Sequence, residues 1–259
     1  MISSKDKRKL FSLLAEVGEE VEYIKNDISN SNIQLKDDES PVSKADIFVN
    51  DELCKYINST QVTNIISEEN KNLGFEYRKK WNYFWCLDPI DGTKEFVSKG
   101  NDYTINIALC FKDYPIFSTV YAPARKELYV AENQNGAKLN QRKISAKKRF
   151  NRKLRVAVSK SHLNNFTKDY LKKLEDNYEI EILQYGSSLK ICKVADGSID
   201  LYPRFGTTME WDTCAADLII KEADGALFVK KNFSLKYNKK LLENPYFIAK
   251  PNKLNIFSN

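Results

Sequence analysis

Two carboxylates separated by a rigid dipeptide are the residues best placed to do chemistry in this chain. Asp88 and Asp91 stand three positions apart within WCLDPIDGTKEF, residues 85–96. The apolar run at 83–87 predicts a buried strand that ends at Asp88, and Gly-Thr at 92–93 predicts the start of a short helix. Like charges this close repel each other unless a cation lies between them, so the pair indicates a divalent metal held by oxygen. Free N–H groups at the helix start would suit a phosphate.

Three further acids occupy similar places, beside a strand end or in the first turn of a helix. Glu68 follows a predicted strand, and Asp46 and Asp212 begin two predicted helices. Taken singly, each has a local explanation: a cap for Asp46, the helix dipole for Asp212 and a solvated turn for Glu68. Asp-Pro and Asp-Gly are also ordinary turn sequences. The residues by themselves therefore leave caps and turns open as the alternative to a metal site.

Composition favours a globular protein, and a solvated basic surface explains its positive charge more often than an anionic partner does. Of the 259 residues, 42% are hydrophobic and 29% charged, so a packed core is expected and disorder is not. The net charge of +6 fits either a nucleic acid or a small phosphorylated substrate. Five scattered cysteines without a C-x-x-C pair indicate buried, reduced thiols. The one histidine, His162, is expected at a structural or surface position.

No targeting or membrane segment is predicted. The N-terminus lacks the apolar core of a signal peptide, and no run of about 18 apolar residues occurs. We expect a cytoplasmic monomer or homodimer, with peripheral attachment at the inner membrane as the alternative.

Apolar spacing predicts mixed helices and strands, and hence layered α/β or α+β packing. Apolar residues at 10, 13, 14, 17, 21 and 24 form one stripe of an amphipathic helix. Further helices are predicted at 43–58, 165–177, 187–196 and 211–223. Strands are predicted at 64–67, 83–87, 103–111, 115–122, 127–131, 154–159, 180–183 and 199–204, with a loop at 70–82.

A basic, apolar-poor segment at 138–155 is interpreted as the seam between two halves. The N-terminal α+β half, 1–137, would carry most of the candidate ligands. The C-terminal α/β half, 138–259, would complete the cleft.

Three blocks in order resemble the inositol monophosphatase-like superfamily of magnesium-dependent, lithium-sensitive phosphatases. They are Glu-Glu at 68–69, W-x-x-D-P-I-D-G-T at 85–93 and W-D-x-x-A-A at 211–216. The resemblance spans about residues 10–250. It implies an αβαβα sandwich and a phosphoric monoester hydrolase.

Within this family, the chain is similar to the CysQ-type 3′(2′),5′-bisphosphate nucleotidases. The segments that carry the similarity are PVSKAD at 41–46, DGTKEF at 91–96, GSSLK at 186–190 and LYPRFG at 201–206. Lys-Glu-Phe after the threonine is more typical of this branch than of the inositol monophosphatases. Lys44 departs from the small residue often found there. The implied reaction converts 3′-phosphoadenosine 5′-phosphate to AMP and phosphate, which links the enzyme to sulfur metabolism.

The resemblance implies a role for each matching residue. Two to three Mg²⁺ ions would be held by Glu68, Asp88, the Ile90 carbonyl, Asp91 and Asp212. Asp88 would bridge two of the ions, and Glu69 would not be a ligand.

The implied catalytic residues are Asp46, Thr93 and Glu68. Thr93 would hydrogen-bond to Asp46 and help to orient and deprotonate the attacking water. The N–H groups of Gly92 and Thr93 would hold the phosphate. Substrate contacts beyond the phosphate would come from Ser187, Lys190 and Arg204. Such chemistry needs oxygen ligands and no cysteine or histidine.

Other functions remain open at this point. An inositol monophosphatase would use the same machinery with a polyol pocket. A protein of another class would bind nucleic acid through the basic residues at 147–155, although no known recognition motif occurs there. A catalytically inactive relative would lack a ligand, and none is missing.

Overall fold

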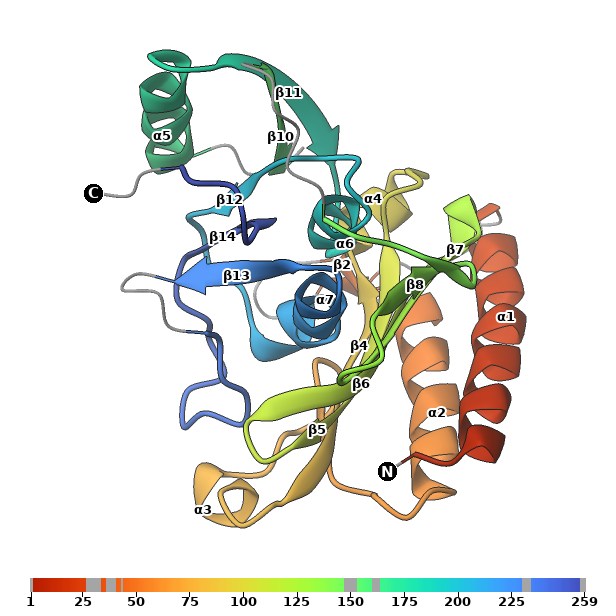
Figure 1. Ribbon diagram of the computed structural model, residues 1–259. Coiled ribbons are helices and arrows are strands. Elements are labelled where there is room, and N and C mark those ends of the chain that lie inside the picture. Colours follow the sequence, from red (N-terminus) through yellow and green to blue (C-terminus); the bar gives the residue numbers. More distant parts are fainter. Residues whose placement is uncertain are drawn as a thin grey trace.

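The computed structural model describes residues 2–26, 34–35, 41–42, 44–146, 153–159, 164–229 and 234–256. Its elements form layers: a helix pair, a large sheet, a second helix pair, a smaller set of strands and a last helix (Figure 1). This arrangement confirms the predicted αβαβα sandwich.

The large sheet lies at the centre because helices cover both of its faces. Residues 104–110 of one inner strand are all buried, which requires an apolar layer on each side. The strand order is β3-β4-β5-β6-β7-β8-β9, with β3 parallel to β4 and the other neighbours antiparallel. The strands are β3 (Ile65–Ser67), β4 (Tyr83–Asp91), β5 (Thr104–Phe111), β6 (Tyr114–Ala122), β7 (Glu127–Glu132), β8 (Ala137–Leu139) and β9 (Arg142–Lys143).

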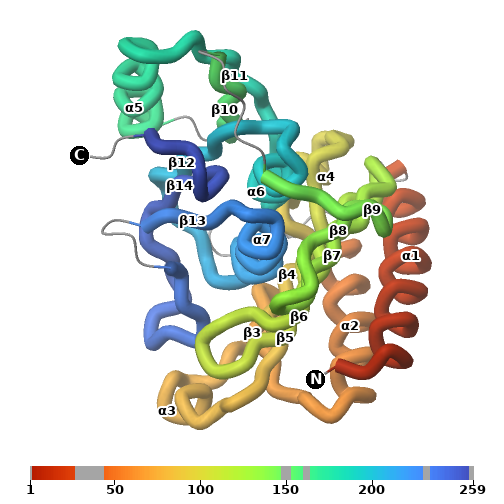
Figure 2. Tube along the Cα trace, in the orientation of Figure 1, coloured from red at the N-terminus to blue at the C-terminus, as the bar shows by residue number. Residues whose placement is uncertain are grey.

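Two long helices cover one face of this sheet, α1 (Ser4–Asn26) and α2 (Lys44–Asn58). They lie side by side in Figures 1 and 2. The predicted apolar stripe is confirmed, because Leu10, Leu14, Val17 and Val21 are all buried. They pack with α2 and the facing side chains of β4 and β5 into one core cluster.

The opposite face is covered by α6 (Leu189–Ala195) and α7 (Glu210–Glu222). Behind them, β12 (Tyr202–Arg204), β14 (Phe247–Pro251) and β13 (Gly225–Val229) form one sheet, and β10 (Lys153–Ser159) and β11 (Glu179–Tyr185) another. A bridge between Val156 and Leu201 joins these two sheets. The last layer is α5 (Asn165–Glu175). Side chains from both predicted halves share one core cluster, which includes Phe84 of β4 and Ile219 of α7.

Three local predictions differ from the structure. The strand at 83–87 continues as β4 to Asp91, so Asp88 lies inside the strand and not at its end. The predicted loop at 70–82 contains a short helix, α3 (Phe75–Arg78). The large sheet continues through β8 and β9 to Lys143, so the predicted boundary after 137 falls within β8.

The short helix after the central motif is confirmed as α4 (Thr93–Val97). The described part of the chain also contains η2 (Pro123–Arg125), β1 (Gln34–Leu35) and β2 (Pro41–Val42). All five cysteines are free thiols. No described helix has the length and apolarity needed to cross a membrane. Ser43, His162 and residues 147–152 lie outside the described residues.

One tight contact fixes the connection between β11 and α6 against the loop that follows α4. A Cβ added to Gly186 would lie 2.5 Å from the Asp102 carbonyl oxygen and 2.7 Å from Cγ of Glu95. The Gly186 N–H also donates to Oδ2 of Asp102 at 3.3 Å. No side chain fits between these two segments.

Gly186→Ala is therefore expected to lower the free energy of unfolding by about 1–3 kcal/mol, because overpacking against a backbone atom cannot be relieved by a rotamer change. Denaturant unfolding measures the loss. Gly74→Ala is the matched control, because nothing lies within 4 Å of its added Cβ, and it should change stability by no more than about 0.5 kcal/mol. Equal effects of the two substitutions would contradict the contact.

Candidate metal centre

Carboxylates from three separate elements meet at one point. Glu68, Asp88 and Asp212 each offer an oxygen, and these oxygens lie within 4.8 Å of one another. Glu68 follows β3, Asp88 lies in the neighbouring strand β4, and Asp212 lies in the first turn of α7. Since β3 and β4 are parallel neighbours, Ser67 pairs with Leu87 and the two acids that follow stand side by side. The structure thus brings together acids that are far apart in the sequence.

Asp88 is the most constrained of these acids. Its residue is 1% exposed, and neither carboxylate oxygen has a hydrogen-bond partner among the described residues. Burial raises the pKa of Asp88 well above its usual value, and the charges of Glu68, Asp91, Asp212 and Asp46 raise it further. A buried carboxylate without donors is costly unless it is protonated or binds a cation. An all-oxygen donor set suits Mg²⁺, so these residues fit that ion.

An irregularity in β4 brings Asp91 to the same side of the strand. Asp88 pairs with Asn106 and Asp91 with Thr104, so three steps along β4 match two along β5. In a regular strand, residues three apart point to opposite faces. The extra residue of this bulge reverses that alternation, and Pro89 fits there because it has no N–H to donate to the ladder.

Hydrogen bonds from the start of α6 and from β5 hold Asp91. Its Oδ2 accepts from the Ser188 N–H and, at 3.4 Å, from Nδ2 of Asn106. Burial raises the pKa of Asp91, while the charge of Lys190 and the Ser188 N–H oppose the rise. Asp212 is oriented by its own helix, because its Oδ2 accepts from the Met209 N–H at 2.8 Å. Burial and the charge of Asp91 raise the pKa of Asp212 well above its usual value.

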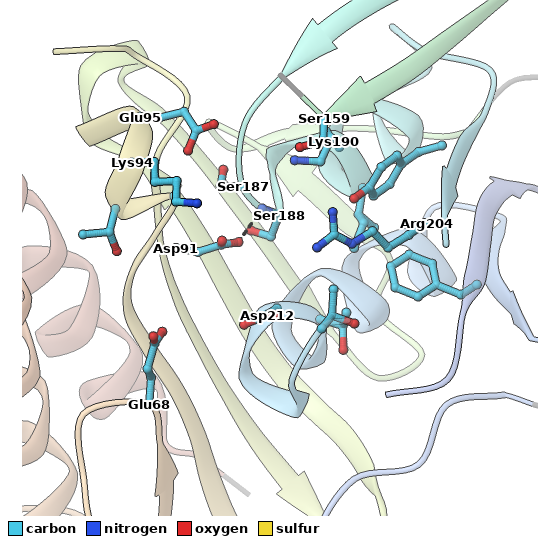
Figure 3. Close-up of a pocket in the computed structure, with 17 residues that line it drawn as sticks. Glu68, Asp91, Lys94, Glu95, Ser159, Ser187, Ser188, Lys190, Arg204 and Asp212 are labelled. Carbon is cyan, nitrogen blue, oxygen red and sulfur yellow. Dashed lines mark hydrogen bonds between the residues drawn. The ribbon is translucent and has the colours of Figure 1, made fainter. Parts of the chain in front are cut away.

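A cavity of about 220 Å³ opens above the acids (Figure 3). Eight of the predicted site residues line it: Glu68, Asp91, Gly92, Thr93, Ser187, Lys190, Arg204 and Asp212. The other three, Asp46, Asp88 and Ile90, are buried beneath its surface. The cavity is also lined by five residues for which the sequence predicted no role: Lys94, Glu95, Ser159, Ser188 and Tyr202.

The turn after Asp91 has the conformation that the Gly-Thr sequence favours. Gly92 has φ 89°, a left-handed conformation that glycine adopts without strain, and α4 begins at the next residue. The Thr93 hydroxyl donates to the Ile90 carbonyl oxygen at 3.2 Å. Asp46 lies buried in the first turn of α2, near enough for its charge to raise the pKa of Asp88.

Two cations line the opposite wall of the cavity. Lys190 is 5% exposed, its Nζ lies 5.4 Å from the ring centroid of Tyr202, and it donates to the Tyr185 carbonyl at 3.4 Å. The pKa of Lys190 is lowered to about 8, because burial and, to a smaller extent, the charge of Arg204 outweigh the opposing charge of Asp91. Arg204 donates through Nη2 to the Thr207 carbonyl at 2.8 Å. Its buried Nε has no partner among the described residues.

Neutral polar residues connect the two walls, and sequence analysis missed them. The Ser188 hydroxyl donates to Oδ1 of Asn106 at 2.9 Å and lies 2.9 Å from Oγ1 of Thr104. Asp102 accepts from Gly186 and pairs with Arg125. Polar residues at alternate positions of a fully buried strand, Thr104 and Asn106, were the available signal.

Comparison with known proteins agrees with this geometry. A model of the inositol monophosphatase family matches residues 7–255. The 3′(2′),5′-bisphosphate nucleotidase CysQ of Haemophilus influenzae is 35% identical over 224 residues, which cover 83% of this chain and 82% of that protein. CysQ of Buchnera aphidicola is 35% identical over 236 residues, covering 89% and 86%.

Solved structures show the same fold. The crystal structure of CysQ from Bacteroides thetaiotaomicron, described as a bacterial member of the inositol monophosphatase family, has a TM-score of 0.83 and 32% identity, covering 93% of this chain and 94% of that chain. An IMPase/NADP phosphatase complexed with Mg²⁺ and phosphate has a TM-score of 0.79 at 20% identity, covering 95% and 90%. The family predicted from the three sequence blocks is confirmed: this chain belongs to the inositol monophosphatase family.

Proposed function

We propose that this chain is a Mg²⁺-dependent phosphatase that hydrolyses the 3′-phosphate of 3′-phosphoadenosine 5′-phosphate, giving AMP and phosphate. Relatives that share about a third of its residues over most of their length bear the name 3′(2′),5′-bisphosphate nucleotidase. Two to three ions, a monomer or homodimer and a cytoplasmic location remain predictions within this proposal.

The environment of the Asp88 carboxylate is the observation that best supports the proposal. It is buried, accepts no hydrogen bond from the described residues and lies among other acids. Stability alone would favour an apolar residue at such a position. A cation held between the carboxylates explains why an acid is there.

Five groups would hold the ions: the carboxylates of Glu68, Asp88, Asp91 and Asp212, and the Ile90 carbonyl. Bound Mg²⁺ would neutralise phosphate oxygens, lower the pKa of a water molecule and stabilise the leaving alkoxide. The Ile90 carbonyl accepts from the Thr93 hydroxyl in this structure, and its second lone pair would be left for a metal ion. The proposed catalytic pair would require the Thr93 hydroxyl to turn toward Asp46.

The remaining residues would bind the substrate and position the water. Glu68, Thr93 and Asp46 would orient the water and accept its proton, and the N–H groups of Gly92 and Thr93 would hold the phosphate. Lys190, Arg204 and Ser187 lie on the other wall of the cavity. Their two cations suit the 5′-phosphate of a bisphosphate nucleotide, because charge-assisted hydrogen bonds to phosphate are stronger than neutral ones.

The alternatives have less support. The curated relatives reported above are bisphosphate nucleotidases and not inositol monophosphatases. For nucleic-acid binding, two described cations of the basic segment already have partners: Arg155 pairs with Asp200 at 2.8 Å, and Lys153 with Glu181 at 3.2 Å. Paired cations contribute little to an electrostatic binding surface.

Asp88→Asn should lower Mg²⁺-dependent phosphate release by more than about 100-fold, because loss of a ligand exceeds the 10- to 100-fold effect of losing an outer contact. Without Mg²⁺, the free energy of unfolding should stay the same or rise, because a buried, repelled charge is removed. Added Mg²⁺ should raise the melting temperature of the wild type but not of the variant. Asp51→Asn, on an exposed position of α2, is the control and should behave like the wild type. Near-normal turnover of Asp88→Asn would refute the ligand assignment.

Lys190→Met should lower kcat/KM for 3′-phosphoadenosine 5′-phosphate by about 10- to 100-fold, the value of a hydrogen bond between charged groups. Adenosine 3′-monophosphate lacks the second phosphate, so its kcat/KM should change little. Steady-state kinetics with the two nucleotides separates these effects. An equal loss on both would show that Lys190 does not bind the 5′-phosphate.

The same residue predicts a pH dependence. A lysine is charged below its pKa, so the wild type should lose kcat/KM for the bisphosphate as pH rises through the Lys190 pKa of about 8. A metal ion that neutralises Asp91 would move this loss to lower pH, because Asp91 helps to keep Lys190 charged. The alkaline loss should be absent for adenosine 3′-monophosphate and in Lys190→Met. A profile that is identical for both substrates would contradict the assignment.

A further inference from the structure

A third cation lines the cavity, and the proposed function gives it no role. Lys94 is the second residue of α4 and lines the cavity together with Lys190 and Arg204. Figure 3 shows it on the same side of the cavity as Asp91, with its side chain directed toward the space between the walls, while Lys190 and Arg204 come from the other side. It is also the first residue of the Lys-Glu-Phe run, which is more typical of the bisphosphate nucleotidases than of the inositol monophosphatases.

The three cations differ in the contacts they already make. Lys190 donates to the Tyr185 carbonyl, and Arg204 donates to the Thr207 carbonyl. Among the described residues, Lys94 has neither a carboxylate within 4.0 Å of its Nζ nor a side-chain hydrogen bond. Its neighbour Glu95 lines the same wall. An exposed ammonium that makes no bond within the described protein can bind a ligand without breaking one.

The position of Lys94 decides which part of a ligand it can reach. It directly follows Thr93, so the two Cα atoms lie about 3.8 Å apart. Its four-carbon stem is flexible and ends in a compact charge, which suits a phosphate bound as a point charge. The group nearest to it would be the phosphate that lies over the acids. The second phosphate would lie against Lys190 and Arg204, across the cavity.

Charge balance supports the same position. Four acids line the cavity, Glu68, Asp91, Glu95 and Asp212, and Asp88 lies beneath. A dianionic phosphate that enters this site meets a negative potential on the α4 side, even where metal ions compensate part of it. Among the described residues that line the cavity, Lys94 is the one cation on the α4 side.

From these observations we infer that Lys94 binds the phosphate group that is transferred, whereas Lys190 and Arg204 bind the second phosphate. The inference rests on the proposed function and assigns a substrate-binding residue to its reaction. Lys94 acts on every phosphate monoester that the enzyme accepts, so it contributes to binding and turnover but not to the preference for a bisphosphate.

The experiment compares Lys94→Met with the wild type on two substrates, 3′-phosphoadenosine 5′-phosphate and adenosine 3′-monophosphate, at saturating Mg²⁺. We expect kcat/KM to fall about tenfold or more on both, and by the same factor, because both carry the transferred phosphate. Inhibition by inorganic phosphate should weaken to a similar extent. Lys94→Arg keeps the charge and should recover most of the activity on both substrates.

Lys71→Met is the matched control. Lys71 is exposed, lies three residues after Glu68 and does not line the cavity. Its loss removes the same charge from the neighbourhood of the site, so it measures the long-range effect alone and should leave both kcat/KM values nearly unchanged. A loss confined to the bisphosphate would overturn the inference, because Lys94 would then bind the second phosphate. No loss on either substrate, or a loss that Lys71→Met reproduces, would also overturn it.

The outcome is separable from that of the proposed function. If the wild type does not prefer the bisphosphate, the proposed substrate fails, but the effect of Lys94→Met on the hydrolysed monoester still tests the inference. Thermal unfolding of each variant with and without Mg²⁺ shows whether the fold and the metal centre are intact. If Lys94→Met unfolds, Lys94→Gln gives the same comparison with a polar side chain in place of the charge.

Discussion

Repulsion among buried and half-buried acids is the constraint on which this structure depends. Two unit charges 4.8 Å apart, the largest separation among the cluster's ligand oxygens, repel by about 3 kcal/mol at an effective dielectric constant of about 20. Three such pairs together approach the whole stability of a typical domain, about 5–15 kcal/mol. The carboxylates of Glu68, Asp88 and Asp212 therefore cannot all be ionised with nothing between them. They must hold protons, which the raised pKa values of Asp88 and Asp212 indicate, or a cation.

Contacts of neighbouring residues help the surrounding fold to keep these acids together. The start of α7 is fixed by Glu210, whose buried carboxylate accepts from the Asn238 and Lys239 N–H groups and from the Lys239 ammonium. Asn244 donates to the Met209 carbonyl, one residue before α7 begins. Parallel pairing sets the position of Glu68 beside β4. Because other contacts hold the backbone, the acids cannot move apart to relieve their repulsion. Binding of a cation relieves it, so the repulsion favours cation binding.

The sequence was sufficient for the parts of the site that repeat a pattern or carry a charge. Asp88 and Asp91 could be predicted from their spacing, and the acids at strand ends and helix starts from their local context.

Three kinds of feature could not be predicted. Four-residue α3 and two-residue β9 are too short to show a period. Pro89 hides the continuation of β4, because proline normally argues against a strand. Contacts such as Ser188 to Asp91 join residues 97 positions apart, and neutral serines and asparagines give no signal of such pairing.

The contact between Ser188 and Asp91 joins the candidate metal centre to the segment that we propose binds the second phosphate. The Ser188 N–H donates to Asp91, and Lys190 follows two residues later on the same short segment. In the metal-free protein, Asp91 is the foremost of the charges that keep buried Lys190 protonated. A cation that neutralises Asp91 removes this support, so Lys190 then needs another anion to stay charged. A second phosphate would supply one. On the proposed assignments, metal binding and binding of a bisphosphate would be coupled through Asp91 and Lys190, and by linkage each would strengthen the other. A substrate with a single phosphate would place no second anion beside Lys190, so the coupling would favour bisphosphates even though the phosphate that reacts is the same.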